Sequence, residues 1–206
     1  MSGGHILLIL VSILVFSGIC QRVLDALSLT DRQALLFVGL ILIGSILPPV
    51  PLFGRIKISL GGAVVPLLLS LYVFLKADTN HERIRTAIAS LAAGCAVLAL
   101  GIFFPDEPGK MFIDINYLYG VLCGLISCTL TRSRRCAFIS GIWGIVLSDV
   151  FQSTALWLQG TEQTLYLGSA GILDAIVISG VTAYLASELT GEFRERIRRG
   201  AKTENT

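Results

Sequence analysis

Apolar residues fall into long blocks along this chain, and short polar stretches separate the blocks. Such a block, with few charges, is typical of a helix that crosses a bilayer, because about 20 apolar residues span the hydrocarbon core. The pattern therefore predicts an all-α, polytopic integral membrane protein with about seven transmembrane helices. The predicted spans cover residues 4–20, 33–47, 59–75, 86–104, 113–130, 136–158 and 168–187.

The second and third predicted helices are interrupted. Residues 47–51 read Leu-Pro-Pro-Val-Pro, and a helix must end or kink before the first proline. Gly61, Gly62 and Pro66 place a second weak point in the third helix. Between the two breaks, residues 55–60 alternate polar and apolar side chains, which is typical of a strand. Because irregular backbone at membrane depth needs protein or a water-filled cavity around it, this segment is either an ordinary extracytoplasmic loop or the border of a cavity.

The basic residues predict an orientation. If the amino terminus lies outside and the carboxyl terminus in the cytoplasm, only Arg55, Lys57 and Lys110 of the 16 basic residues fall on the outer side. Such a bias of Lys and Arg toward the cytoplasm sets the topology of membrane proteins. We therefore expect a multi-pass protein of a cell membrane. Residues 1–187 would form one transmembrane helical domain, and residues 188–206 a cytoplasmic basic tail.

Composition and charge agree with this class. Hydrophobic residues make up 54% of the chain and charged residues only 15%, whereas about 25% of a typical soluble domain is charged. The net charge of +2 means little by itself, and the basic tail favours contact with anionic lipid head groups over nucleic acid. The expected partner is the lipid bilayer. We expect no metal and no cofactor, because the five cysteines and two histidines lack metal-ligand spacing.

Small residues form stripes on two predicted helices, and such stripes let membrane helices approach closely. We expect tight packing around the last predicted helix. The stripes are Gly120, Gly124, Ser127 and Cys128 on the fifth helix, and Gly171, Ala175, Ser179 and Ala183 on the seventh.

Two acids inside the last two predicted spans are the main candidates for chemistry. They are Asp149 and Asp174, and an ionisable residue within a span marks a functional site by default because its charge is costly in hydrocarbon. At a rise of 1.5 Å per residue, the two acids would lie about 13 Å and about 9 Å below the outer boundary. Consecutive helices joined by a short loop are usually neighbours. Both carboxyl groups are thus expected at similar depth in the outer half of the bilayer.

Two carboxyl groups that meet in a site of low dielectric constant share one proton, so that one acts as a base and the other as an acid. Such a dyad can activate water for amide hydrolysis. Our leading hypothesis is therefore an intramembrane aspartyl hydrolase with Asp149 and Asp174 as catalytic residues. Residues 171–174, Gly-Ile-Leu-Asp, partly resemble the Gly-x-Gly-Asp signature of intramembrane aspartyl proteases, with Leu173 in place of the second glycine. We expect residues 55–60 to bind an unwound single-span membrane peptide by strand addition.

Other functions fit the same residues. A proton- or cation-coupled transporter of a small solute would use the broken helices to frame the same acids. A non-catalytic membrane assembly factor would use them only for packing: Asp149 within a polar network on its helix, and Asp174 paired with Arg55 or Lys57. The residues that we expect on the substrate side of the site are Arg55, Lys57, Gly61, Gly62, Pro66, Gly171 and Gln152.

Three stretches resemble an uncharacterised prokaryotic membrane family, domain of unknown function sixteen-fourteen. They are residues 57–72 (KISLGGAVVPLLLSLY), 137–152 (AFISGIWGIVLSDVFQ) and 167–187 (LGSAGILDAIVISGVTAYLAS). The chain departs mildly from the family pattern at Ser169, where glycine is frequent, and at Leu173, where phenylalanine is frequent. The resemblance implies a prokaryotic inner or plasma membrane and a shared fold, yet no established activity. Its matching positions are Gly61, Gly62, Pro66, Asp149, Gly171 and Asp174.

Overall fold

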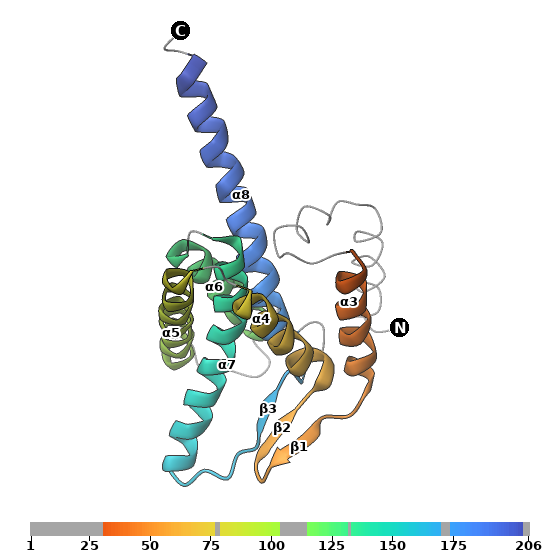
Figure 1. Cartoon of the computed structure of the whole chain (residues 1–206). Coiled ribbons are helices and arrows are strands. Elements are labelled where there is room, and N and C mark those ends of the chain that lie inside the picture. Colours follow the sequence, from red (N-terminus) through yellow and green to blue (C-terminus); the bar gives the residue numbers. More distant parts are fainter. Residues whose placement is uncertain (1–30, 77–78, 104–114, 132, 170–173, 204–206) are drawn as a thin grey trace.

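The computed structural model describes residues 31–76, 79–103, 115–131, 133–169 and 174–203. This part of the chain is mostly helical, as predicted, with a small sheet at one end (Figure 1). The first predicted span, residues 4–20, lies outside the described residues. The α-helices are α3 Asp31–Ile46, α4 Val65–Leu75, α5 Asn80–Phe103, α6 Ile115–Leu130, α7 Arg134–Leu158 and α8 Ala175–Thr203. A π-helix, η1 Leu60–Val64, precedes α4, and the strands are β1 Val50–Phe53, β2 Ile56–Ile58 and β3 Leu165–Leu167.

Two of the described helices, α5 and α7, are long and apolar enough to cross a membrane. The surface of α5 carries large apolar side chains: Ile84, Ile88 and Leu91 are 59%, 63% and 49% exposed. Contiguous exposed apolar surface is rare in soluble monomers, where it marks an interaction with protein or membrane. The length of these helices and the apolar surface of α5 are thus features of a membrane-associated protein.

The break predicted after the second helix is confirmed, whereas the irregularity in the third predicted helix is a π-helix that continues without interruption into α4. Helix α3 ends at Ile46, just before the prolines. The chain then turns through the β1–β2 hairpin and enters the π-helix η1, where the amide of Gly62 donates to Ser59 Oγ at 3.4 Å. A Cβ on Gly44 of α3 would lie only 2.6 Å from the nitrogen of Gly61. The glycines at this break therefore let α3 and η1 pack backbone against backbone.

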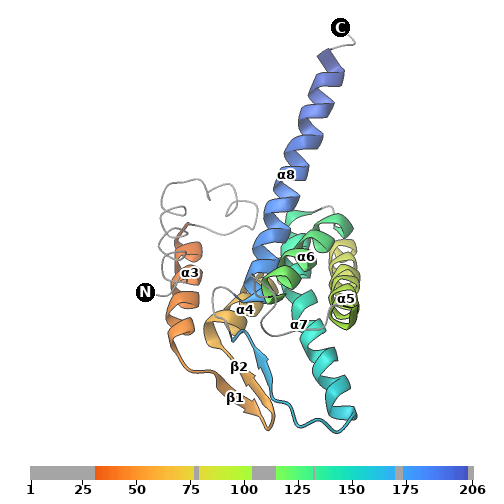
Figure 2. The same ribbon diagram turned by 180° about the vertical axis from the view of Figure 1, so that it is seen from behind.

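The prediction of an all-α fold is wrong in one respect, because three short strands form a sheet in the order β1-β2-β3. Strands β1 and β2 are antiparallel, and β3 pairs with β2 in parallel, with Lys57 opposite Tyr166. The alternating pattern of residues 55–60 correctly indicated β2. Strand β3 lay unrecognised just before the seventh predicted span. Two views place the sheet at the end of the bundle opposite the carboxyl terminus (Figures 1 and 2).

Helix α8 begins later than the sequence predicts. The predicted span starts at Gly168, but this residue has a φ of +75° and follows β3, and α8 begins at Ala175. A Cβ on Gly168 would lie 2.5 Å from the nitrogen of Ala63, so a glycine is needed where β3 leaves the sheet against η1. Asp174 consequently stands immediately before α8 and not six residues inside a helix.

The core of the bundle is formed by α5, α6, α7 and α8, with α5 against α7 and α6 against α8. Small residues make these contacts close, as the predicted stripes indicated. A Cβ on Gly124 of α6 would meet the Ser179 carbonyl oxygen of α8 at 2.7 Å, and one on Gly141 of α7 would meet the same oxygen at 2.8 Å. Ser179 therefore lies where three helices converge.

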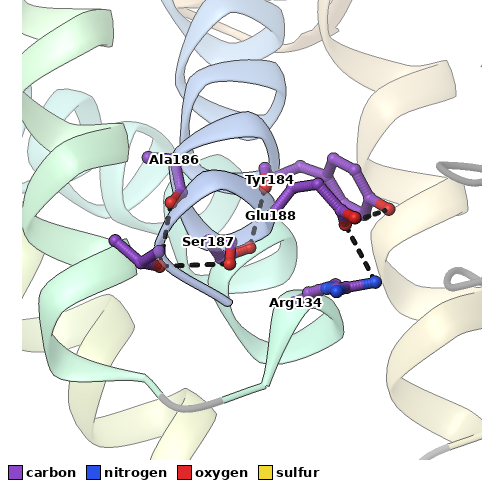
Figure 3. Close-up of polar contacts among 6 residues, drawn as sticks. Arg134, Tyr184, Ala186, Ser187 and Glu188 are labelled. Carbon is purple, nitrogen blue, oxygen red and sulfur yellow. Dashed lines mark hydrogen bonds and ion pairs between the residues drawn. The ribbon is translucent and has the colours of Figure 1, made fainter. Parts of the chain in front are cut away.

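At the end of the bundle away from the sheet, α7 and α8 are joined by an ion pair (Figure 3). Arg134 Nη1 lies 2.9 Å from Glu188 Oε2, and the Tyr184 hydroxyl donates to the same carboxylate at 3.4 Å. Tyr184 is only 2% exposed. The pair thus joins the first turn of α7 to the side of α8.

Candidate functional site

Both candidate acids line one cavity of about 320 Å³. Its walls are α7, strand β3 with the segment before it, the first residues of α6 and the start of α8. Polar side chains of Gln152, Asn116 and Ser169 share this wall with the two aspartates. The structure therefore brings together the two residues that the sequence singled out.

Asp149 reaches the cavity because of its position on α7. Gln152, Ser153 and Leu156 follow it by three, four and seven residues and line the same cavity, as helical periodicity requires. The Asp149 carboxyl interacts electrostatically with that of Asp174. Ser148, one residue earlier, is buried at 4% exposure and lines a neighbouring cavity instead.

Asp174 is held by the start of its own helix. Its Oδ1 accepts a hydrogen bond from the Ile176 amide at 3.1 Å, and its carbonyl oxygen accepts one from the Ile178 amide at 3.0 Å. This is the geometry of an N-cap residue, which satisfies an amide that the helix leaves unpaired. The amino end of a helix also favours a negative charge. Asp174 thus has a structural role at this position whatever its chemistry.

Arg55 and Lys57, which the sequence offered as neutralising partners of the acids, have other partners in the described structure. Arg55 Nη2 lies 2.7 Å from Glu162 Oε1 in a pair whose side chains are 51% and 82% exposed. Lys57 Nζ donates to the Tyr166 hydroxyl at 3.1 Å and lies 5.1 Å from the centre of that ring. Neither cation lines the cavity that contains the acids.

The remaining residues predicted for the site divide between the cavity and the helix break. Gln152 lines the cavity. Gly61 and Gly62 are buried in η1 and Pro66 is buried at the start of α4, and none of the three lines the cavity. Gly171 lies outside the described residues.

One wall of the cavity, the wall that faces α7, was not predicted from the sequence. Gln163, Thr164, Leu165 and Tyr166 line the cavity, and the carbonyl oxygen of Gln163 accepts a hydrogen bond from Trp157 Nε1 at 2.8 Å. Little in the sequence signals this wall, because its residues belong to a short polar linker and a strand of three residues. Asn116, at the start of α6, carried a weaker signal as a polar residue beside an apolar block.

A second cavity of about 270 Å³ adjoins the first. Asn116, Asp149 and Gln152 line both cavities, and the second extends to Val97 and Gly101 of α5. Asp149 therefore stands at the junction of two cavities. The pair of carboxyl groups can exchange a proton with water, and the surrounding space can admit water or a solute.

Among the described residues, no cluster of three or more His, Cys, Asp or Glu side chains could hold a metal ion.

Fold and site together define a mostly helical protein with two helices capable of spanning a membrane and a polar cavity that holds two acids. The chain belongs to the family described as "Protein of unknown function (DUF1614)", whose model matches residues 49–186. This confirms the family resemblance found in the sequence. Comparison with curated proteins and with solved structures gives no match.

Proposed function

We propose that this protein is a multi-pass membrane hydrolase of peptide bonds, in which Asp149 and Asp174 form an aspartyl dyad. The proposal rests on one observation, namely that Asp149 and Asp174 line the same cavity of about 320 Å³. Its other polar groups are amides and hydroxyls, and neither Arg55 nor Lys57 lines it to neutralise the pair. Two acids in one partly enclosed site retain a shared proton more readily than two acids in bulk water.

The proposed topology places the sheet and the dyad toward the outside of the cell and the carboxyl terminus in the cytoplasm. Support comes from basic residues at the opposite end of the bundle, where α4 ends and where α5 and α7 begin. An excess of Lys and Arg on one side is typical of the cytoplasmic face. These residues are Lys76, Arg83, Arg85, Arg134 and Arg135.

The surroundings of the two acids suggest different roles. Asp174 accepts the Ile176 amide at the amino end of α8, and both this bond and the helix dipole favour its charged form. Asp149 has no hydrogen-bond partner of this kind among the described residues and lies against the second cavity. We therefore assign the base to Asp174 and the acid that holds the shared proton to Asp149.

In this scheme Asp174 takes a proton from a water molecule, and the water oxygen attacks the carbonyl carbon of the peptide bond. Asp149 gives its proton to the carbonyl oxygen, which leaves a neutral tetrahedral intermediate. The carbon–nitrogen bond then breaks as the nitrogen takes the proton from Asp174 and a hydroxyl of the intermediate returns one to Asp149. The products are a carboxylic acid and an amine, and the dyad again holds one proton.

The decisive experiment incubates the purified full chain in liposomes with single-span peptides and follows cleavage by mass spectrometry. Asp149→Asn and Asp174→Asn should each lower the rate by about 10²- to 10⁴-fold, the usual contribution of a general acid or base. Glu162→Gln is the matched control, because it makes the same chemical change at an acid that is 82% exposed and paired with Arg55.

Each outcome of this experiment assigns a function. Cleavage by the wild type and the control, with none by folded Asn variants, supports the hydrolase. Equal cleavage by all variants refutes the dyad. If both Asn variants fail to fold while Glu162→Gln folds normally, the acids serve packing, as expected of a non-catalytic assembly factor.

The second cavity favours one alternative, a proton-coupled carrier of a small solute. Asp149 lies between the two cavities, and an acid at such a junction can pass protons between them. A pH-sensitive dye inside the liposomes would report proton entry. Proton flux that is lost in Asp149→Asn, in a protein that cleaves no peptide, would assign the carrier and exclude the hydrolase.

A further inference from the structure

The position of the strands decides where an extended peptide can pair with the sheet. Strand β2 is the central strand, with β1 on one side and β3 on the other. Its main-chain groups are therefore already bonded, which corrects the expectation that residues 55–60 receive a peptide by strand addition. Among the described strands, only β1 and β3 have an edge without a partner.

The two edges differ in what lies beside them. Strand β3 lines the cavity that holds Asp149 and Asp174, whereas no residue of β1 does. Strand β3 is also flanked by α7, since Trp157 Nε1 donates to the carbonyl oxygen of Gln163, just before the strand. The free edge of β3 and the two acids thus belong to one cavity.

The ladder between β2 and β3 determines which main-chain groups of β3 are available. Leu165 donates its amide to the Arg55 carbonyl at 2.8 Å, and the Leu167 carbonyl accepts from the Ser59 amide at 2.9 Å. Because successive residues of a strand direct their N–H and C=O groups to opposite sides, those of Tyr166 point away from β2. Tyr166 therefore offers one donor and one acceptor at the free edge.

The side chains around this edge keep the strand in place. Leu165 and Leu167 are each 7% exposed and anchor the strand in the core, whereas Tyr166 is 48% exposed. The Tyr166 hydroxyl accepts a hydrogen bond from Lys57 on β2, so its side chain lies along the sheet. An edge with fixed side chains and open main-chain groups is suited to strand addition.

We propose that the edge of β3 binds the substrate as an added strand through the main chain of Tyr166, which holds an extended stretch of polypeptide beside Asp149 and Asp174. This inference rests on the proposed hydrolase. It names the substrate class as a peptide that is unwound over a few residues at its outer membrane end. Extension also exposes the carbonyl carbon that a helix would shield from attack.

Tyr166→Pro tests this role with a matched control. Proline removes the outward amide of residue 166 but leaves the Leu165 and Leu167 bonds to β2. Tyr166→Ala also loses the phenol and its contact with Lys57, yet keeps the amide. We expect Tyr166→Pro to lower kcat/KM for single-span peptides by about tenfold relative to Tyr166→Ala, the loss of one main-chain hydrogen bond. Equal values in two folded variants overturn the proposal.

A substrate-side measurement keeps the proposal testable if the proline variant does not fold. Single-span peptides with one N-methylated residue would be tested for binding to the Asp149→Asn protein by fluorescence anisotropy. A strand pairs through every second residue, so methylation should weaken binding at alternate positions only. Uniform loss, or loss with a helical period, overturns strand addition.

Binding and cleavage separate this proposal from the hydrolase. If methylation weakens binding at alternate positions but the wild type cleaves no peptide, strand addition at β3 is supported and the hydrolase is refuted. If the wild type cleaves the peptides but methylation has no alternating effect on binding, the hydrolase is supported and strand addition at β3 is refuted. A shift to dimers that is lost in Tyr166→Pro would instead assign the edge to a second copy of the chain and overturn a peptide substrate.

Discussion

Replacing Asp174 with alanine or asparagine separates its structural role from its chemistry. Alanine removes the Oδ1 acceptor of the Ile176 amide, a hydrogen bond of 3.1 Å, and also removes the charge at the helix end. Loss of an N-cap costs about 1 kcal/mol, and loss of a favourable charge–dipole interaction costs about 0.3–1 kcal/mol. We therefore expect Asp174→Ala to lower the free energy of unfolding by about 1–2 kcal/mol.

Asparagine should behave differently, because it caps helices about as well as aspartate. Asp174→Asn keeps the bond to Ile176 and loses the interaction of the charge with the helix, and the loss expected from this helix interaction is about 0.5 kcal/mol. For a chain of about 200 residues, 1 kcal/mol corresponds to a shift in Tm of about 2–4 °C. Thermal denaturation in one detergent, followed by tryptophan fluorescence, measures this difference.

The same two variants should lose peptide cleavage to a similar extent, since neither provides a carboxylate. The expected pattern is thus unequal stability with equal loss of activity. An Asp174→Asn protein as unstable as Asp174→Ala would refute the capping role, and full activity in either variant would refute the dyad.

Three further predictions concern a helix contact, a hydrogen bond and an ion pair. Gly141→Ala should destabilise the protein by about 1–3 kcal/mol, because its Cβ would lie 2.8 Å from the Ser179 carbonyl oxygen. The control in the same denaturant titration is Gly39→Ala, whose Cβ would have no atom within 4 Å. Equal effects of the two substitutions would refute the close helix contact at Gly141. Ser70→Ala should cost about 1–3 kcal/mol by removing the acceptor of Trp143 Nε1 at 2.8 Å, with a change in tryptophan emission; unchanged stability would argue against this bond. Glu188→Gln should cost about 1 kcal/mol, because the Arg134 side chain is 39% exposed although that of Glu188 is only 18% exposed, and glutamine keeps an oxygen that can accept the bond from Tyr184; a much larger loss in thermal denaturation would contradict this prediction.

Much of the helical framework could be predicted from hydrophobicity alone. The blocks that became α5 and α7 are long and largely apolar, so both helices were expected where they occur, although α5 begins at Asn80, before the predicted start at residue 86. Pro48 and Pro49 also indicated the end of α3 correctly, because proline acts locally on the backbone. Such signals need no knowledge of distant contacts.

The sheet and the exact position of Asp174 could not be predicted from the sequence, because both depend on contacts between distant parts of the chain. Leu165 and Leu167 form a strand only because β2 lies beside them, and three apolar-rich residues carry no periodicity of their own. The apolar composition of this region therefore suggested a helix that starts at Gly168, whereas this glycine follows β3 and α8 begins at Ala175. The two acids were identified from the cost of burying charge, whereas their shared cavity depends on β3 and on the start of α6.

The pairing of β3 with β2 has a consequence for how the protein is made. Lys57 and Tyr166 are 109 residues apart in the chain, so a ribosome finishes the π-helix η1 and the α-helices α4 to α7 before this contact is possible. Pairing between such distant segments forms late in folding, because a long loop must close first. The cavity lined by Asp149 and Asp174 is therefore complete only after most of the chain has been made, because its walls include β3 and the start of α8.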